Sequence, residues 1–232
     1  MMKSVKDLIL LGDRDPGKVT HRELDAAIQQ LPGSIRARWV ATGSPQAAHT
    51  GRADALWVVS GSPFQDDDAV YEAIKAARIS GQPFLGTCAG FQYAVVEFAR
   101  DVAGIRGAGH AESSDSAEDL VIEKLACSLV GQQRQVTAID GTRLHELMGS
   151  SPFPGFHWCN YGLAPAYAER LVEHGLAISA IAPDAGVEAI ELPAHPFFLA
   201  TLFQPQIGSL AGQALHPVIQ AFVAASANLS VQ

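Results

Sequence analysis

The first hundred residues alternate between short apolar runs and segments whose apolar side chains recur at helical spacing. The runs "VKDLILLGD", "IRARWVAT", "ALWVVSGS" and "PFLGT" have the length and composition of buried strands. Helical patterns separate most of these runs, and this alternation predicts a mostly parallel sheet with helices on both faces. The expected strands cover residues 5–13, 35–42, 55–62 and 83–87, and the expected helices cover 20–31, 66–80 and a segment from 89 onward.

Two of these helical segments carry start or stop signals. Thr20 and Glu23 have the spacing of a capping box at the start of 20–31. Asp66 heads an acidic cluster that suits the positive N-terminal end of the helix 66–80, and Gly81 suits its end. We therefore expect both helices to begin where these signals lie.

The second half of the chain predicts an antiparallel excursion and then a return to the sheet. Residues 107–119 are interpreted as a polar loop, and 120–131 and 134–140 as strands of a hairpin-rich insertion. The whole pattern predicts one three-layer α/β domain over residues 1–232, with no linker that would divide it. After the insertion we expect a helix over 165–175, strands over 176–183, 187–192 and 197–204, and a helix over 211–227.

Composition narrows the classes of partner. The 232 residues are 48% hydrophobic and 17% charged, with a formal net charge of −8. No dense stripe of Lys and Arg could follow a phosphate backbone, so we expect no nucleic acid partner. No apolar run reaches membrane-spanning length, and the N-terminal segment lacks a cleavage site, so a cytoplasmic protein without membrane contact is expected. A small molecule is the expected partner, no cofactor or metal is implied, and a homodimer is left open.

The segment "FLGTCAGFQ" has the pattern of a strand, a tight turn and a helix, with Cys88 in the turn. Gly86 and Gly90 flank this cysteine as G-x-C-x-G, where missing side chains allow a strained turn and close helix packing. A helix N-terminus at Cys88 would favour the thiolate and present N–H groups to an oxyanion. The alternative is a buried cysteine in an ordinary turn, and the two glycines favour the nucleophile.

This segment resembles the nucleophile segment of class I glutamine amidotransferases, most closely the C-terminal glutaminase domain of CTP synthases. The resemblance extends over residues 143–150, 166–206 and the His-Pro pair at 216 and 217. It implies a flavodoxin-like fold and a thioester formed on Cys88. It also implies an oxyanion hole from the N–H of Ala89 and that of Gly61 or Ser62, with Gln92 holding substrate. The amidoligase domain of CTP synthases has no room in 232 residues, so CTP synthesis by this chain alone is not expected.

The pattern breaks where the family places its base and orienting acid. The family's His-Pro-Glu is replaced here by Gln204-Pro-Gln206, and an amide cannot take up a proton near neutral pH. The segment 153–165 also departs from the family's arginine- and histidine-rich run before the matching Tyr161, which suggests a different ligand. We therefore place Gln204, Gln206, Asn160 and Tyr161 among the substrate-binding candidates.

Two other places could supply the missing base. His110 and Glu112 match the loop that binds the glutamine amine in the family, and His157 lies in the altered segment. For each histidine the alternative is a solvated loop position. Among the other thiols, Cys127 is expected to be buried in a strand, while Cys159 is expected either to line the site or to be structural.

Three functions remain open at this stage. The first is a cysteine-nucleophile enzyme, a hydrolase or amidotransferase acting on a small amide-like or amino-acid-like substrate through Cys88. The second is an inactive module that binds a small metabolite or regulates a partner. The third is a thiol redox protein that uses Cys88 with Cys159.

Overall fold

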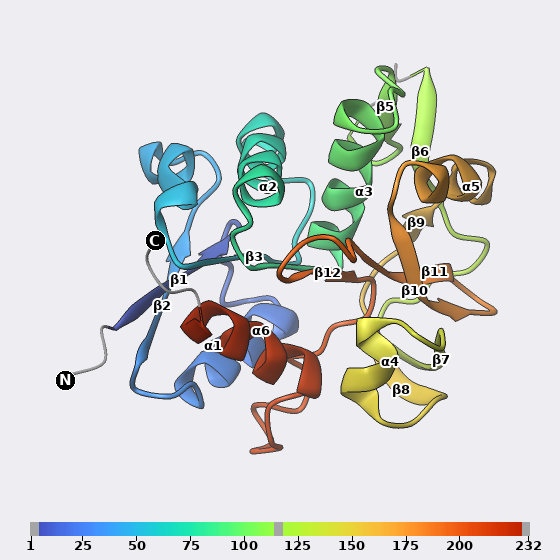
Figure 1. The fold of residues 1–232 in the computed structure, drawn as a ribbon. Coiled ribbons are helices and arrows are strands. Elements are labelled where there is room, and N and C mark those ends of the chain that lie inside the picture. The colour runs from blue at the N-terminus through green and yellow to red at the C-terminus, as the bar shows by residue number, and fades with distance from the viewer. Residues whose placement is uncertain (1–4, 114–117, 229–232) are drawn as a thin grey trace.

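A nine-stranded sheet runs through the middle of the molecule in the computed structural model, which describes residues 5–113 and 118–228 (Figure 1). Helices cover both of its faces, as the alternating pattern predicts. In spatial order the strands are β2 (Ile35–Val40), β1 (Lys6–Leu11), β3 (Ala55–Val58), β4 (Phe84–Thr87), β12 (Phe198–Thr201), β11 (Gly186–Glu191), β10 (Ala177–Ala182), β7 (Gln132–Ala138) and β8 (Phe153–His157).

The sheet changes direction half-way across, which corrects the expectation of a mostly parallel sheet. From β2 to β12 neighbouring strands are parallel, whereas every pairing from β12 through β11, β10 and β7 to β8 is antiparallel. The parallel half is the alternating strand–helix part of the chain, joined by β12. The antiparallel half contains the hairpins, which need no helix to connect them. The sheet is therefore mixed, within the expected three-layer α/β class.

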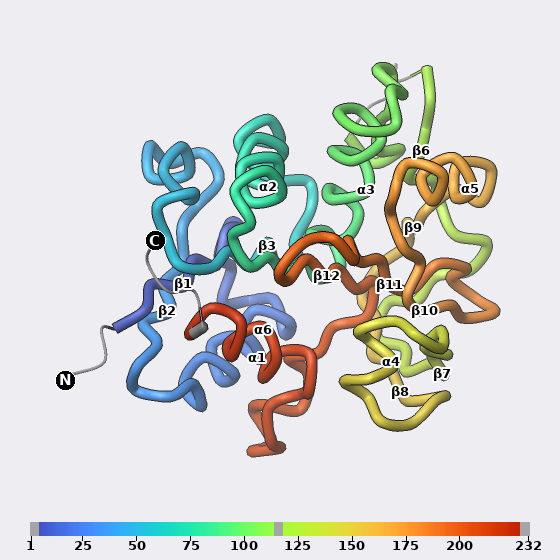
Figure 2. Tube along the Cα trace, viewed as in Figure 1, coloured from blue at the N-terminus to red at the C-terminus, as the bar shows by residue number. Residues whose placement is uncertain are grey.

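Each face of the sheet has its own apolar core. The helices α2 (Asp67–Ser80) and α3 (Ala89–Asp101) pack on one face, while α1 (Val19–Gln29), α4 (Arg143–Met148) and α6 (Pro217–Asn228) lie on the other (Figures 1 and 2). Successive residues of β1 show the division, because Ile9 and Leu11 face α2 and α3 whereas Leu8 and Leu10 face the other core. Residues of α3 are almost entirely buried, so this helix forms the centre of its layer.

A second, three-stranded sheet packs against α3, and it corrects the prediction of a loop over 107–119. Its order is β5 (Ala108–His110), β6 (Asp119–Lys124) and β9 (Tyr161–Leu163), and α5 (Pro165–Glu173) follows β9. The buried side chains of Val121, Ile122 and Leu163 join the core under α3. The two ends of the predicted loop are thus strands, and residues 114–117 lie outside the described part.

The two predicted helix starts have different outcomes. Asp66 caps α2 by accepting a hydrogen bond from the N–H of Ala69 at 2.9 Å, and Gly81 ends the helix with φ 76°. The capping box of α1 is wrong, since the helix begins at Val19 without a side-chain cap. Thr20 instead accepts a hydrogen bond from the hydroxyl of Ser60, and Glu23 accepts one from the N–H of Leu210. Both side chains tie α1 to other segments.

The start of the last helix and the end of one expected strand also differ from the prediction. The last helix begins at Pro217 rather than 211, because Gly212 has φ 74° in a turn and a proline cannot continue a helix from the residues before it. The strand expected over 120–131 ends at Lys124, and Cys127 is exposed in the loop that follows. Cys127 is therefore neither buried nor in a strand.

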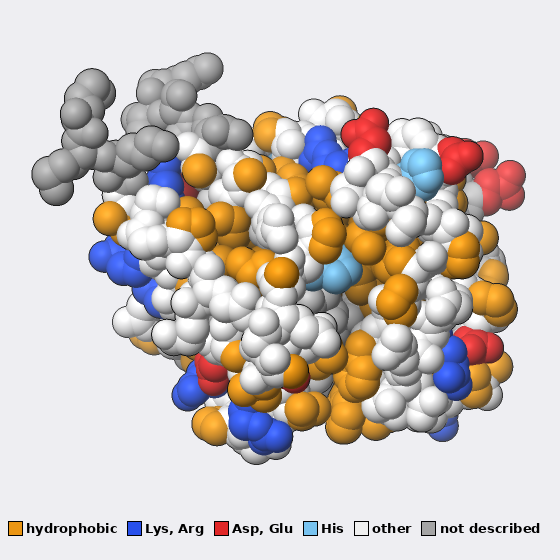
Figure 3. Space-filling model, turned by 90° about the horizontal axis from the view of Figure 1, so that it is seen from below, with side chains coloured by type: hydrophobic (Ala, Val, Ile, Leu, Met, Phe, Trp, Pro, Cys, Tyr) orange, Lys and Arg blue, Asp and Glu red, His pale blue; other side chains and the backbone are white. Residues whose placement is uncertain are grey.

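Charged side chains do not gather on the surface that Figure 3 presents, where Lys and Arg are scattered among apolar and polar groups. Over residues 5–113 and 118–228, no helix is long and apolar enough to cross a bilayer.

The close approach of α3 to β3 generates a stability prediction. A Cβ added to Gly90 would overlap the carbonyl oxygen of Val58, a backbone atom that cannot move away. We expect Gly90→Ala to lower the free energy of unfolding by about 3 kcal/mol, as for an overpacked core site. Gly33→Ala is the matched control, because a Cβ there meets nothing within 4 Å. Urea unfolding of the two variants checks this, and equal stabilities would contradict the packing argument.

Candidate active site at the cysteine turn

Cys88 has a strained backbone between β4 and α3. Its φ of 55° and ψ of −105° make it the only non-glycine residue with positive φ in the described part of the chain. Its N–H donates to the carbonyl of Thr201 on β12 at 2.8 Å, and its carbonyl accepts from the N–H of Phe91 and Gln92 in the first turn of α3. Strain of this kind costs about 1–3 kcal/mol and persists only where the surroundings impose it. The strained turn predicted from the glycines is therefore present, and the nucleophilic role of Cys88 stays a prediction.

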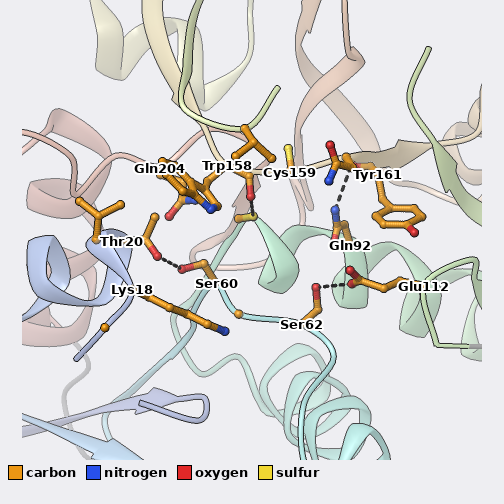
Figure 4. A pocket seen from close by; sticks show the side chains of 16 residues that line it. Lys18, Thr20, Ser60, Ser62, Gln92, Glu112, Trp158, Cys159, Tyr161 and Gln204 are labelled. Carbon is orange, nitrogen blue, oxygen red and sulfur yellow. Dashed lines mark hydrogen bonds between the residues drawn. The ribbon is translucent and has the colours of Figure 1, made fainter. Parts of the chain in front are cut away.

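Cys88 opens into a cavity of about 490 Å³ at the carboxyl edge of the parallel strands (Figure 4). This edge is where loops after neighbouring parallel strands converge in α/β folds. The cavity brings together segments far apart in the sequence. It is lined by Gly17, Lys18, Val19, Thr20, Ser60, Gly61, Ser62, Cys88, Gln92, Glu112, Val130, Trp158, Cys159, Asn160, Tyr161 and Gln204.

The loop after β3 supplies one wall of the cavity. Gly61 has φ 122°, a conformation that favours glycine, and it lines the cavity with Ser62. The buried His21 fixes this loop, because its Nε2 bonds the carbonyl of Ser60 at 2.8 Å while its Nδ1 accepts from the N–H of Asp15. Burial lowers the pKa of His21, which suits this neutral role.

Backbone N–H groups near the thiol are available to a ligand. No described residue accepts a hydrogen bond from the N–H of Gly61, Ser62 or Ala89. Ala89 is the first residue of α3, where helix N–H groups have no partner within the helix. Ala89 itself is buried and does not line the cavity. The oxyanion hole therefore stays a prediction. The residues Gly61 and Ser62 line the cavity, whereas Ala89 does not.

His110 is engaged on both of its ring nitrogens. Its Nδ1 accepts from the N–H of Glu112 at 3.0 Å, so its Nε2 carries the proton and donates to Oε1 of Gln92 at 3.0 Å. The Gln92 amide in turn donates to the carbonyl of Tyr161 at 2.8 Å. Burial lowers the pKa of His110 to about 4. His110 thus orients Gln92 and has no free nitrogen with which to act as the predicted base.

The Glu112 carboxylate, the other candidate in this loop, does not bond His110. That carboxylate lines the cavity and accepts a hydrogen bond from the hydroxyl of Ser62 at 2.7 Å. It is exposed, and it connects the loop after β3 with the loop after β5. Asn160 and Tyr161, two of the predicted substrate-binding residues, line the same cavity.

The two glutamines in place of the family's base and acid bond each other. Gln206 donates to Oε1 of Gln204 at 2.7 Å and, at 3.5 Å, to the carbonyl of Thr20. Gln204 lines the cavity, whereas Gln206 is 1% exposed and lies behind it. The Nε2 of Gln204 and the Oε1 of Gln206 have no partner in the described chain. Gln206 therefore does not reach a ligand in the cavity directly, whereas Gln204 can.

A buried histidine–glutamate pair, only half of which the sequence suggested, lies beside the site. His157 at the end of β8 and Glu188 on β11 are both 0% exposed, and Nε2 of His157 is 2.9 Å from both carboxylate oxygens. The Nδ1 of His157 has no partner in the part of the chain described here. A carboxylate inside the apolar strand "GVEAIE" was the signal for Glu188, since charges are rarely buried without a partner.

Cys159 stands next to Cys88. The Sγ of Cys88 is 3.7 Å from the carbonyl oxygen of Trp158, the residue before Cys159, so the two thiols are close enough to interact. The interaction with Cys88 and, next, burial raise the pKa of Cys159, and the charge of Glu188 acts in the same direction. Trp158 is exposed while His157 and Cys159 are buried, so the latter two side chains share the inward side of this segment.

Lys18 adds a positive charge that sequence analysis missed. It lines the cavity and forms no ion pair with any described residue, and its Nζ would lie 3.3 Å from a Cβ on Gly61. The loop from Gly12 to Lys18 shows no pattern that distinguishes this lysine from a surface one.

Comparison with known proteins agrees with the turn and the sheet. The family model described as glutamine amidotransferase class-I matches residues 24–205, which include Cys88 and Gln204. The chain belongs to the class I glutamine amidotransferase family. The CTP synthase of Natronomonas pharaonis is 34% identical over 197 residues, covering 80% of this chain and 36% of its own length. That of Archaeoglobus fulgidus is 38% identical over 167 residues, covering 67% and 31%.

The solved glutaminase domain of Trypanosoma brucei CTPS with bound acivicin superimposes with a TM-score of 0.82, covering 98% of this chain and 96% of that domain at 22% identity. This likeness confirms the flavodoxin-like class I amidotransferase fold. The chain spans about a third of the length of the CTP synthases it matches. It is thus glutamine amidotransferase-like and similar to their glutaminase region.

Two histidines with lowered pKa values generate a pH prediction. His110 and His216 each have a pKa lowered to about 4 by burial, so below pH 6.5 the unfolded chain binds protons that the native state does not. The free energy of unfolding should fall as pH drops from 6.5 towards 4. His110→Gln should reduce this loss by on the order of 3 kcal/mol. Urea unfolding at pH 7.5 and 4.5 measures it, with exposed His49→Gln as control. An unchanged loss in His110→Gln would show that His110 is protonated in the native state.

Proposed function

We propose that this protein is a cysteine-dependent enzyme that forms a thioester between Cys88 and the side-chain acyl group of a small amino-acid-like carboxamide. The observation that carries the proposal is the strained Cys88 at the head of α3, open to a cavity. An ordinary buried cysteine requires neither a positive φ nor two glycines packed against backbone. Nucleophiles placed in such turns face the attacking position directly, with helix N–H groups beside them.

The charges of the cavity support an amino-acid-like ligand. Glu112 provides a carboxylate that could bind an ammonium group, and Lys18 provides an ammonium that could bind a carboxylate. Both are exposed at the cavity, so their charges need not be desolvated before a ligand arrives. A ligand carrying an amine and a carboxylate, together with a carbonyl near Cys88, complements this lining. The absence of an arginine-rich run at 153–165 favours a substrate other than free glutamine.

We infer that the His157–Glu188 pair takes the place of the family's base and acid. Gln204 and Gln206 cannot accept a proton, and His110 has no free ring nitrogen. His157 keeps one unpartnered nitrogen, and Glu188 orients the ring through the other. The route from Cys88 passes the thiol of Cys159, which contacts Cys88 and lies within electrostatic reach of Glu188.

The proposed reaction has two steps, formation of the thioester with release of ammonia and then hydrolysis of the thioester. The Cys88 sulfur bonds the amide carbon, its proton passes to His157, and the tetrahedral oxyanion is held by backbone N–H groups. The C–N bond then breaks, and the proton returns to the leaving nitrogen, which departs as ammonia. Water next attacks the thioester carbon, a carboxylate is released, and the thiol of Cys88 is restored.

A directed electrophile tests the ligand class. A chloroketone analogue of glutamine should alkylate Cys88 selectively, because Glu112 and Lys18 place it, whereas iodoacetamide makes no such contacts. The exposed Cys127 is an internal reference thiol, so peptide mass spectrometry can measure the Cys88:Cys127 labelling ratio for each reagent. We expect a higher ratio with the analogue, and Glu112→Gln should lower it. Equal ratios for the two reagents would overturn the amino-acid site.

The proposed role of His157 and Glu188 is tested by measuring two steps separately: the attack of the Cys88 sulfur and the release of ammonia. Chloride leaves without a proton whereas ammonia needs one, so Glu188→Gln should still be alkylated by the chloroketone but lose ammonia release by about a hundredfold or more. Assays with glutamine and related short carboxamides, with ammonia detected enzymatically, measure this split. Cys88→Ser should lose both reactions.

Glu191→Gln is the matched control, because Glu191 lies buried on the same strand and bonds the N–H groups of Arg143 and Leu144 instead. It should keep both reactions if circular dichroism shows that it folds. Equal loss in the two glutamate variants would make Glu188 structural. Failure of the unmodified protein to release ammonia from any carboxamide would leave a binding module.

A further inference from the structure

The thiols of Cys88 and Cys159 form a pair whose chemistry can go beyond carrying a proton in acyl transfer. They come from the turn after β4 and from the segment between β8 and β9, and both line the same cavity. Each is 6% exposed, and the Sγ of Cys88 is 3.7 Å from the carbonyl oxygen of Trp158, the residue before Cys159. Figure 4 shows the thiol of Cys159 at this cavity. Cys88 is held by backbone bonds to β12 and α3, so the pair is placed by the fold rather than by the reach of flexible side chains.

We propose that Cys88 and Cys159 constitute a two-thiol redox site that reduces a small hydroperoxide. Because the sulfurs are nearly buried, a small oxidant can reach them while a protein disulfide cannot. Bonding requires the sulfurs to close from contact to about 2 Å. The segment carrying Cys159 contains the exposed Trp158 and is not part of either neighbouring strand, so it is the side of the pair that can move.

The two cysteines have different roles in this chemistry. Cys88 is the attacking sulfur, because the strained turn at the head of α3 holds it at the cavity that a small oxidant would enter. Cys159 is kept protonated by its contact with Cys88, by burial and by the charge of Glu188. It therefore remains an intact thiol while Cys88 reacts, and then resolves the product.

The proposed reduction of the peroxide has two chemical steps, oxidation of Cys88 and formation of a disulfide with Cys159. The Cys88 thiolate attacks one peroxide oxygen, the O–O bond breaks, and the second oxygen leaves with a proton as water or an alcohol. Cys88 becomes a sulfenic acid. The Cys159 sulfur then bonds the Cys88 sulfur, and its proton leaves with the hydroxyl as water. Two thiols have lost two electrons to the peroxide, and two equivalents of a thiol reductant restore them.

The experiment exposes the reduced full-length protein to one equivalent of hydrogen peroxide. Intact mass should fall by two hydrogen atoms, and peptide mapping should find Cys88 linked to Cys159 with Cys127 still free. Peroxide consumption with dithiothreitol as reductant should then proceed over many turnovers. Cys127→Ser should behave as the unmodified protein does, because Cys127 is exposed and outside the cavity.

Cys159→Ser should lose the mass change and the turnover, and a dimedone probe should instead trap sulfenic acid on Cys88. If that variant fails to fold, the linkage in the unmodified protein still decides the matter. Oxidation of Cys127 first, or bonds only between molecules, would overturn the proposal.

The tests of the redox proposal and of the acyl-transfer proposal can fail independently of each other. Cys159→Ser should still react with the chloroketone at Cys88 if the amino-acid site exists, whatever peroxide does. Conversely, if the chloroketone does not label Cys88 selectively over Cys127, the disulfide between Cys88 and Cys159 should still form with peroxide. The oxidised protein should resist the chloroketone until dithiothreitol is added, and labelling of the oxidised form at the reduced rate would contradict a disulfide at Cys88.

Discussion

The backbone of Cys88 is the constraint from which the rest of the site follows. Holding a side-chain-bearing residue at φ 55° requires support from both sides, and this comes from Thr201 on β12 and from the first turn of α3. The support works only if α3 can approach β3 and β4 closely, which the absent side chains of Gly86 and Gly90 allow. Because β4 and β12 are parallel neighbours, the loops after them open at the same edge. The position of the cavity is thus a result of sheet direction.

The chain keeps this constraint while the residues in the place of the family's base and acid are different. The place of the family's base holds two glutamines that bond each other, and each retains an unpartnered polar atom. The proposal assigns this role to His157 and Glu188, which lie on strands beyond β12. A carboxylate buried against a histidine is weak evidence for stability, because the cost of desolvating the charge offsets much of the gain from the contact. Its position next to two contacting thiols is therefore better explained by chemistry than by stability.

Much of this arrangement could be predicted from local sequence signals. The glycines around Cys88 predict the strained turn, the family motifs predict the fold, and the Asp66 and Gly81 signals predict the ends of α2. Local signals failed where long-range contacts decide: Thr20 and Glu23 look like a capping box, but they bond segments distant in sequence. The buried state of His110 and its bond to Gln92 likewise depend on β5 pairing with β6.

The charged residues of the site were the hardest to predict. Glu188 could be suspected only because a carboxylate interrupts an apolar strand, and its partner is 31 positions away on a strand that is not adjacent. Lys18 has no local signal at all. The exposed state of Cys127 follows from β6 ending at Lys124, where Leu125 bonds the carbonyl of Asn160. In each case, tertiary contacts outweighed propensity.

The two proposed reactions, acyl transfer and peroxide reduction, would compete for the Cys88 sulfur, and this would link them thermodynamically. A substrate placed over Cys88 binds the reduced protein, since a disulfide removes the attacking thiol. Ligand binding to one state stabilises it by about 2.7 kcal/mol when the ligand is at a hundred times its Kd. For a two-electron couple this corresponds to roughly 60 mV in favour of the thiols. Cys88 would therefore be protected from oxidation while substrate is abundant, and closed by Cys159 when substrate is scarce. The same sulfur contact that allows the disulfide thus makes the redox state of this cavity depend on its ligand.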